Sequence, residues 1–135
     1  MNPQDRLIFA LDVPGKKEAE HYAKILEGVV GCFKIGLELF ISEGPDIVKM
    51  IQDQSGANIF LDLKLHDIPA TVRGALRSAE KLGVQYITIH STEGEAILET
   101  AQEVKGSGLE VLAVTVLTSA SASSLASLGI REDIN

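Results

Sequence analysis

The segment FLDLKLHDIP, residues 60–69, places charged side chains inside a run that otherwise has the composition of a buried β-strand. Its leucines alternate with Asp62 and Lys64, and a second acid, Asp67, follows just before Ile-Pro. Because residues i and i+2 of a strand point to the same face, Asp62 and Lys64 are expected to share one face and the leucines the other. Burying such a pair is rarely worth its desolvation cost for stability alone, so the pattern indicates a chemical role.

Short apolar runs rich in β-branched residues recur along the chain and alternate with segments of helical spacing. The runs are LIFALDV (7–13), CFKIG (32–36), NIFLDLKL (58–65), YITIHS (86–91) and LEVLAVTVLTS (109–119). The helical segments between them are 16–30, 45–56, 71–83 and 94–108, and the last two end at Gly, a common helix stop. This alternation predicts a single domain over residues 1–135 with parallel strands and right-handed crossovers.

A polar residue stands at the end of each apolar run, about one β/α unit from the next. These residues are Asp12, Lys34, Asp62 with Lys64, His90 and Thr118. In a (β/α)₈ barrel the functional groups sit at the carboxyl ends of the strands, whereas a doubly wound sheet binds ligands mainly near a switch point. Five successive polar strand ends favour an α/β fold of the TIM-barrel type. The chain would supply about the first five strands and four helices of that (β/α)₈ barrel.

Composition excludes several classes of function. The chain has 135 residues, 45% of them hydrophobic, and a net charge of −7, which argues against non-specific binding to nucleic acid or to anionic membranes. It shows neither a signal segment nor an apolar run long enough to span a bilayer. The single cysteine, Cys32, cannot form an internal disulfide and predicts a cytoplasmic protein, and a structural zinc site is not expected.

Several of these residues also fit a structural role. An Asp-x-Lys pair on a strand is commonly a solvated ion pair, although the flanking leucines favour burial here. Asp67 could cap the next helix, with Pro69 as its first residue, and Asp12 could cap the first helix. Lys34 could be a snorkelling surface lysine. Structural roles also remain open for His66, His90 and Thr118.

The motif FLDLKLHDIPATV, residues 60–72, resembles the signature of the orotidine 5′-monophosphate decarboxylase family, whose members form UMP. FALDV (9–13), FKIGLELF (33–40) and VLTS (116–119) agree with the same family, so the resemblance runs over essentially the whole chain. Sugar-phosphate decarboxylases and lyases of the same superfamily share the D-x-K-x-x-D core. They carry an acidic metal ligand where this chain has Lys34, which favours the decarboxylase.

The resemblance implies a role for each charged residue. Lys64 is implied as the proton donor to C6 of the pyrimidine after CO₂ leaves, and Asp62 as the group that crowds the departing carboxylate. Lys34 and Asp67 are implied to complete a Lys-Asp-Lys-Asp chain, with Asp67 coming from the partner subunit of a homodimer. The implied substrate-binding residues are Asp12, Lys34, Asp62, Ile68, Thr71 and Thr118. No metal or organic cofactor is implied.

The length of the chain raises two alternatives. A complete barrel of this kind takes about 250 residues, and the family's phosphate-binding loop and arginine are expected beyond the fifth strand. We therefore expect the 135-residue chain by itself to be inactive and to associate through its open strand edges. The alternatives are a non-catalytic barrel fragment that acts only by assembly, and a sugar-phosphate decarboxylase or lyase, which metal dependence would reveal.

Overall fold

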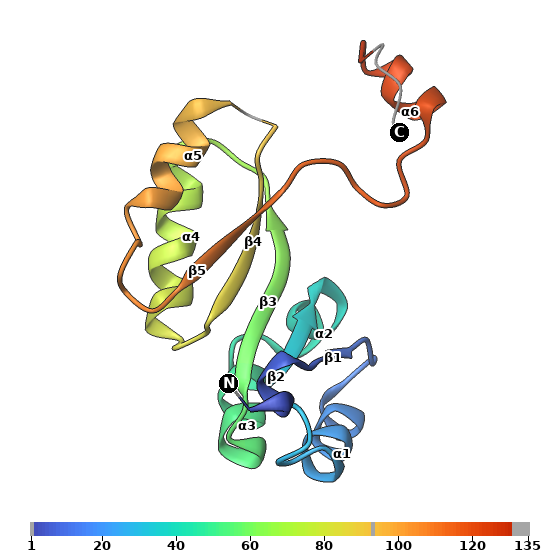
Figure 1. Ribbon diagram of the computed structural model, residues 1–135, viewed down its shortest axis with the longest axis vertical. Helices are drawn as coiled ribbons and strands as arrows, with labels where there is room; N and C mark the ends of the chain where they lie inside the picture. Colours follow the sequence, from blue (N-terminus) through green and yellow to red (C-terminus); the bar gives the residue numbers. More distant parts are fainter. Residues whose placement is uncertain (1, 93, 131–135) are drawn as a thin grey trace.

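The computed structural model describes residues 2–92 and 94–130, in which five parallel strands form one sheet. The strands are β1 (Ile8–Leu11), β2 (Cys32–Gly36), β3 (Asn58–Leu65), β4 (Tyr86–His90) and β5 (Glu110–Val114). Their order in the sheet is β1-β2-β3-β4-β5, so each strand lies beside the one that precedes it in the chain (Figure 1). Every crossover therefore advances in the same direction, as in a barrel, and the strand order has no reversal of the doubly wound kind.

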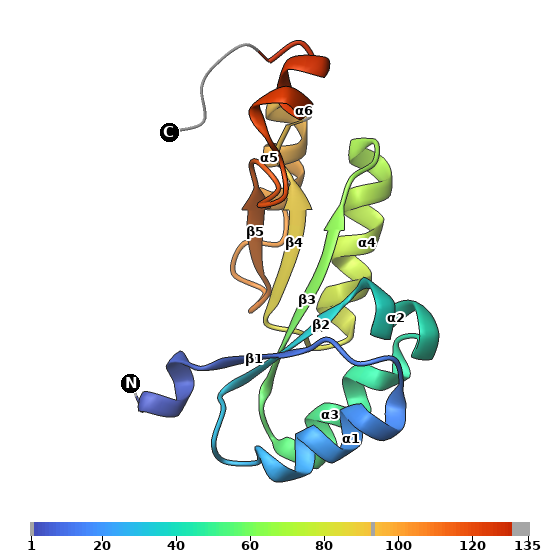
Figure 2. The ribbon, with the colours of Figure 1, turned by 90° about the vertical axis from the view of Figure 1, so that its right-hand side faces the viewer.

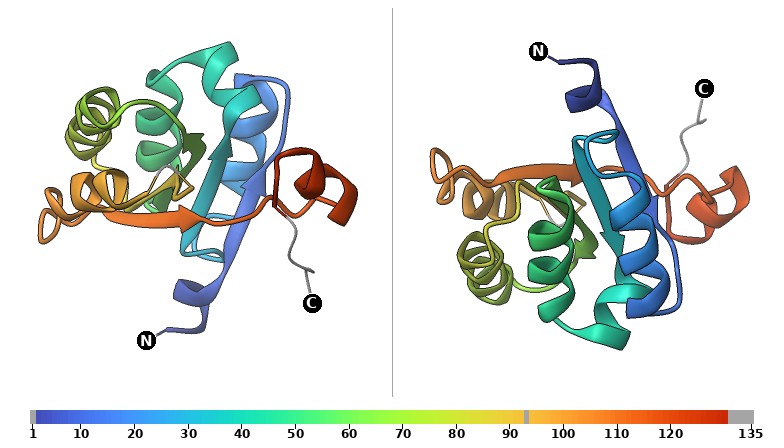
Figure 3. Two further views of the ribbon diagram at one scale, coloured as in Figure 1. Left: turned by 90° about the horizontal axis from the view of Figure 1, so that it is seen from above. Right: turned by 90° about the horizontal axis from the view of Figure 1, so that it is seen from below.

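In the described part of the chain, the α-helices that precede the fifth strand lie along the outer, convex side of the curved sheet (Figures 2 and 3). A 3₁₀-helix covers Pro3–Arg6, and the α-helices are α1 (Lys16–Ile25), α2 (Leu37–Glu43), α3 (Asp46–Ser55), α4 (Pro69–Lys81), α5 (Glu95–Gln102) and α6 (Ala122–Ser127). Helix α1 packs against α3, and α4 packs against α5. Within residues 2–92 and 94–130, no helix is long and apolar enough to cross a membrane.

The core fills the space between the strands and these helices. Alternate strand residues point outward and are buried by the helices: Leu11, Phe33, Ile35, Ile59, Leu61, Ile87 and Ile89. The intervening residues point to the concave side, where strand register places Ala10, Lys34, Phe60, Tyr86 and Glu110 in one row. The concave side therefore carries charged groups such as Lys34 and Glu110 among other residues, and the convex side carries the apolar contacts that stabilise the fold.

The structure differs from the sequence-based prediction in its helices and at several element boundaries. Helix α2 was not predicted, and the described residues contain six α-helices rather than four. The predicted strand 109–119 ends at Val114, because its hydrogen-bonding neighbour β4 ends at His90, the residue paired with Val114. The chain then leaves the sheet toward α6 (Figure 1), and Thr118 lies exposed in a turn rather than at a strand end.

Candidate active site

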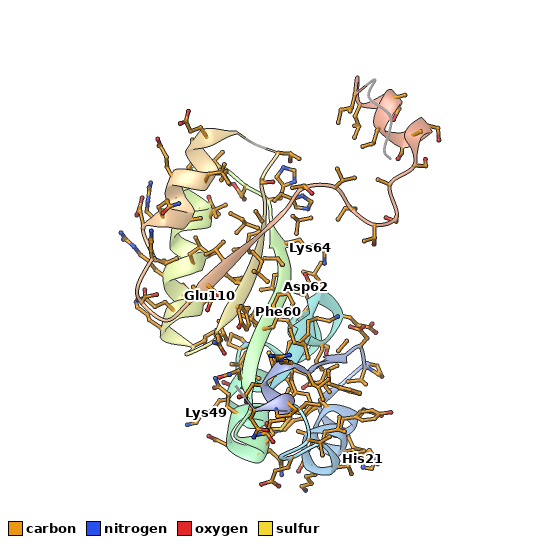
Figure 4. All side chains as sticks on the ribbon, in the orientation of Figure 1. His21, Lys49, Phe60, Asp62, Lys64 and Glu110 are labelled. Atoms are coloured by element: carbon orange, nitrogen blue, oxygen red, sulfur yellow. The ribbon has the colours of Figure 1, made fainter. Side chains whose placement is uncertain are left out.

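Two ion pairs stand side by side on neighbouring strands at the carboxyl end of the sheet. Lys34 Nζ on β2 lies 2.5 Å from Asp12 Oδ1, just after β1, and Lys64 Nζ lies 2.7 Å from Asp62 Oδ1 on β3. Figure 4 shows Asp62 and Lys64 following Phe60 toward the end of β3. The structure thus brings together four of the charged residues predicted from the strand ends.

In the Lys34–Asp12 pair, the lysine is largely buried and the aspartate is exposed. The side chain of Lys34 is 17% exposed and that of Asp12 is 67% exposed, so the lysine is not a snorkelling surface residue and the carboxylate is reachable from solvent. Asp12 does not cap α1, whose N-cap residue is Gly15. At Gly36, the register partner of Asp62, an added methyl group would be in ordinary van der Waals contact with this pair, 3.5 Å from Asp12 Oδ1 and 3.6 Å from Lys34 Nζ. The absence of a side chain there leaves space beside the pair.

Lys64 sits in a bulge rather than in a regular strand. Strand β3 advances four residues, from Leu61 to Leu65, while β4 advances only two, from Ile87 to Ile89. Lys64 has φ = +49°, and among the described residues no other residue except glycine has a positive φ. This left-handed conformation costs about 1–3 kcal/mol in a residue with a side chain, and such strain is concentrated at functional sites. Lys64 therefore reaches Asp62 from a strained backbone conformation. The alternation of residues along the strand predicted a shared face but not this strain.

Asp62 is held as a carboxylate. Its Oδ1 accepts hydrogen bonds from Lys64 Nζ at 2.7 Å and from the Thr88 hydroxyl at 3.0 Å, and its side chain is 21% exposed. Burial acts to raise the pKa of Asp62. The hydrogen bonds from Lys64 and Thr88, together with the positive charges of Lys64 and Lys34, outweigh burial and hold this pKa below its usual value. The carboxylate is therefore ionised at neutral pH.

The loop after β3 and the first turn of α4 hold Asp67, Ile68 and Thr71, which within the described residues form no hydrogen bond with either ion pair. Asp67 Oδ1 accepts the backbone N–H of Ile68 at 2.7 Å, and in the described part of the chain Asp67 forms no ion pair with either lysine. The helix-cap alternative for Asp67 is wrong, because the N-cap of α4 is Ile68, without a side-chain cap, and Pro69 is the first helical residue. Ile68 and Thr71 are exposed beside Asp67.

A hollow of about 560 Å³ opens beside this loop. It is lined by His66, Asp67, Ile68, Pro69, Ala96 and Ile97. The ring of His66, one of these lining residues, lies against the ring of His90, with the centroids 4.9 Å apart and the planes tilted by 36°. The two histidines join the ends of β3 and β4, which fits the structural role left open for them.

Sequence reasoning missed Thr88. This threonine is buried on the concave side of β4, where it donates to Asp62 and accepts the backbone N–H of Lys64 at 2.8 Å. The available signal was a polar residue in the middle of YITIH, in phase with the strand-end His90.

Comparisons with known proteins agree with this geometry. The family model described as "Orotidine 5'-phosphate decarboxylase / HUMPS family" matches residues 5–134. A relative from Anaeromyxobacter sp. (strain K), named orotidine 5′-phosphate decarboxylase, is 45% identical over 130 residues, 96% of this chain and 57% of the relative. A relative of the same name from Desulfosudis oleivorans is 46% identical over 128 residues, 94% of this chain and 51% of the relative.

Solved structures of decarboxylases with this name are also similar. The enzyme from Lactobacillus acidophilus matches with a TM-score of 0.75 and 35% identity, over 91% of this chain and 58% of that one. The enzyme from Methanocaldococcus jannaschii matches with a TM-score of 0.80 and 27% identity, over 89% and 59%. The predicted TIM-barrel class is confirmed, and the chain covers about half of the barrel. It spans about half the length of the curated relatives that it matches.

The lowered pKa of Asp62 predicts a pH-dependent contribution to stability. A carboxyl whose pKa is lower in the folded state stabilises that state above its unfolded pKa, and this contribution is lost as the pH falls through the folded pKa. We expect Asp62→Asn to have a smaller free energy of unfolding than the parent at pH 7, with the difference shrinking below about pH 4.

Urea unfolding followed by circular dichroism at a series of pH values measures this difference. Asp53→Asn, at an exposed position of α3, controls for the general loss of one negative charge. If the free energies of unfolding of Asp62→Asn and the parent differ by the same amount from neutral to acidic pH, the pKa of Asp62 is not lowered in the folded state.

Proposed function

Because this chain belongs to the orotidine 5′-phosphate decarboxylase / HUMPS family, we propose that it carries the charged centre of an enzyme that converts orotidine 5′-monophosphate to UMP in pyrimidine biosynthesis. The observation that supports this most directly is the Lys64–Asp62 pair, half-buried on β3 with the Lys34–Asp12 pair beside it. A fixed cation next to a fixed anion suits a reaction that expels a carboxylate as CO₂ and leaves an electron pair on carbon.

The reaction proposed for this pair needs no cofactor, because its electrons and its proton are both accounted for. The bond from C6 of the pyrimidine to its carboxylate breaks, CO₂ leaves, and the electron pair stays on C6. The Lys64 ammonium stabilises this carbanion and then donates a proton to C6, and the neutral amine recovers its proton from solvent. The ionised Asp62 carboxylate, held in place by its hydrogen bonds, repels the substrate carboxylate but not the neutral CO₂. The site therefore favours the transition state over the bound substrate.

The Lys34–Asp12 pair fits the role of holding the sugar. The exposed Asp12 carboxylate can accept hydrogen bonds from ribose hydroxyls, and the Lys34 ammonium can donate to them. Lys34 also places a positive charge where the sugar-phosphate relatives are expected to have an acidic metal ligand. Such a charge repels a metal cation, which supports decarboxylation of the nucleotide over the sugar-phosphate reaction.

The exposed loop after β3 supports assembly into a homodimer. Ile68 is 66% exposed although its side chain is large and apolar, and Asp67 and Thr71 lie exposed beside it. We assign these three residues to the active site of a second copy of the chain, where Asp67 approaches the Lys34 and Lys64 ammonium groups. If Thr118 contacts the pyrimidine, as the resemblance implies, it must move from its exposed turn when the barrel is completed.

A cytoplasmic location is consistent with the single thiol. Cys32 is buried on β2, and burial raises its pKa to about 11, so the thiol stays protonated and takes no part in the proposed chemistry.

The proposed proton donor is tested by Lys64→Ala. The protein is produced with all the sequence that its gene encodes after Asn135. If the gene ends there, residues 1–135 are joined to the C-terminal half of the Anaeromyxobacter relative. We expect kcat, followed by the loss of substrate absorbance, to fall at least ~10³-fold because a preorganised charge and a proton donor are both lost. Lys49→Ala, at an exposed lysine of α3 (Figure 4), should retain parental kcat. Near-normal turnover by Lys64→Ala would refute the assignment.

The choice between the two reactions of the superfamily is tested by chelation. With Lys34 in place of a metal-binding acid, turnover of orotidine 5′-monophosphate should survive exhaustive treatment with EDTA. Loss of turnover that Mg²⁺ restores would instead favour a sugar-phosphate decarboxylase or lyase.

The shared site is tested by mixing Lys64→Ala with Asp67→Ala subunits. If Asp67 serves the neighbouring subunit, each mixed dimer contains one intact site and one doubly altered site. About half of the dimers are mixed, so roughly a quarter of the parental activity should return after subunit exchange. If activity stays at the level of the separate variants although exchange is demonstrated, Asp67 acts within its own subunit.

A further inference from the structure

We propose that Thr88 is a positioning residue, whose one buried hydroxyl holds the Lys64 backbone and the Asp62 carboxylate in their working arrangement. This inference rests on the proposed role of the Lys64–Asp62 pair. Thr88 is 5% exposed and lies in the middle of β4, opposite the bulge in β3. Its hydroxyl forms hydrogen bonds with the Asp62 carboxylate and with the Lys64 backbone, and the Lys34–Asp12 pair is not among these partners.

The hydrogen bonds form a closed ring. The backbone N–H of Lys64 donates to Thr88 Oγ1 at 2.8 Å, and Thr88 Oγ1 donates to Asp62 Oδ1 at 3.0 Å. The same Oδ1 accepts Lys64 Nζ at 2.7 Å, which closes the ring at the other end of the lysine. A hydroxyl has a single hydrogen to donate, so these partners fix its direction. Thr88 therefore acts on both ends of Lys64.

The bulge explains why a side chain is needed at this point. Between Leu61 and Leu65 the regular pairing of β3 with β4 is interrupted, and there the Lys64 N–H donates to a side chain, the Thr88 hydroxyl. A buried N–H without an acceptor is unfavourable, and the left-handed backbone of Lys64 is strained as well. The Thr88 oxygen supplies an acceptor for this N–H and supports the strained conformation that directs the ammonium group.

The position of that oxygen is itself rigid. Ile87 and Ile89, on either side of Thr88, are buried in the core on the opposite face of β4. Threonine is β-branched, so its χ1 angle is restricted in a strand. The hydroxyl is therefore fixed by the packing of β4, and it transfers this rigidity to two side chains of β3.

Four variants at two positions isolate the hydroxyl. Thr88→Val keeps the shape of the side chain and removes the oxygen, whereas Thr88→Ser keeps the oxygen. Thr100→Val is the matched control, because Thr100 is also a buried threonine but its hydroxyl donates to the Ala96 carbonyl within α5. If Thr88→Val fails to fold, Thr88→Ala compared with Thr88→Ser tests the same hydroxyl at smaller volume.

Enzyme kinetics give the first readout. They are measured in the same extended protein, with sequence after Asn135, that is used to test Lys64→Ala. We expect Thr88→Val to lower kcat about 10- to 100-fold, as for a misplaced catalytic group, with little change in KM. Thr88→Ser should recover most of the lost kcat, and Thr100→Val should match the parent. Parental kcat in Thr88→Val, or an equal loss in Thr88→Ser, would overturn the proposal.

Carboxyl NMR gives a second readout that needs no turnover. The Asp62 resonance is followed between about pH 2 and pH 6, which covers the range of aspartates in folded proteins and the lowered pKa of Asp62. Losing the Thr88 donor should raise the pKa of Asp62 in Thr88→Val and not in Thr88→Ser, while the positive charges of Lys64 and Lys34 remain. If the parent does not decarboxylate the nucleotide but the Asp62 titration shifts as expected, the proposed function fails and the positioning role stands. An unshifted titration in Thr88→Val overturns the positioning role whatever the activity.

Discussion

Strand register is the constraint on which this site depends. Parallel pairing places Lys34 opposite Ala10 and Gly36 opposite Asp62, so that both ion pairs emerge on the concave side of the sheet. Because successive strand residues point to opposite faces, a shift of one residue would turn the charged side chains into the helix-packed core. The buried outward residues, such as Phe33 and Leu61, prevent that shift. The apolar core thus determines where the charged side chains lie, although its residues take no part in the proposed reaction.

Within this frame, the centre is built from opposite charges held at short range. Each lysine has its own carboxylate, and Gly36 keeps side-chain atoms out of the space beside the first pair. Asp62 receives two donors at one oxygen, so its direction is fixed before a substrate arrives. Charges that are already oriented need little reorganisation during a reaction, which is where an enzyme gains most from electrostatics.

Much of the fold could be predicted from the sequence, because its signals are local. Strands β2 and β3 were predicted with the observed bounds, since their apolar runs stop at glycine or at a polar segment. The seven-residue helix α2 is too short for its periodicity to be recognised. The site was predicted as a set of polar strand ends, which located Asp12, Lys34, Asp62 and Lys64. The β3 bulge arises from pairing between distant segments, so no local pattern indicates it. The polar Thr88 within YITIH marked a candidate position, but its partners on β3 depend on that same pairing. The same holds for the end of β5, where pairing with β4 decides the boundary.

The positive φ of Lys64 sets two selective pressures against each other at one position. Glycine adopts this backbone without strain but carries no ammonium group, whereas lysine carries the charge and must bear the strain. A mutational screen for thermal stability would therefore favour variants at position 64 that a screen for turnover eliminates. Stability and activity commonly conflict in this way where a fold holds a residue in an unfavourable conformation.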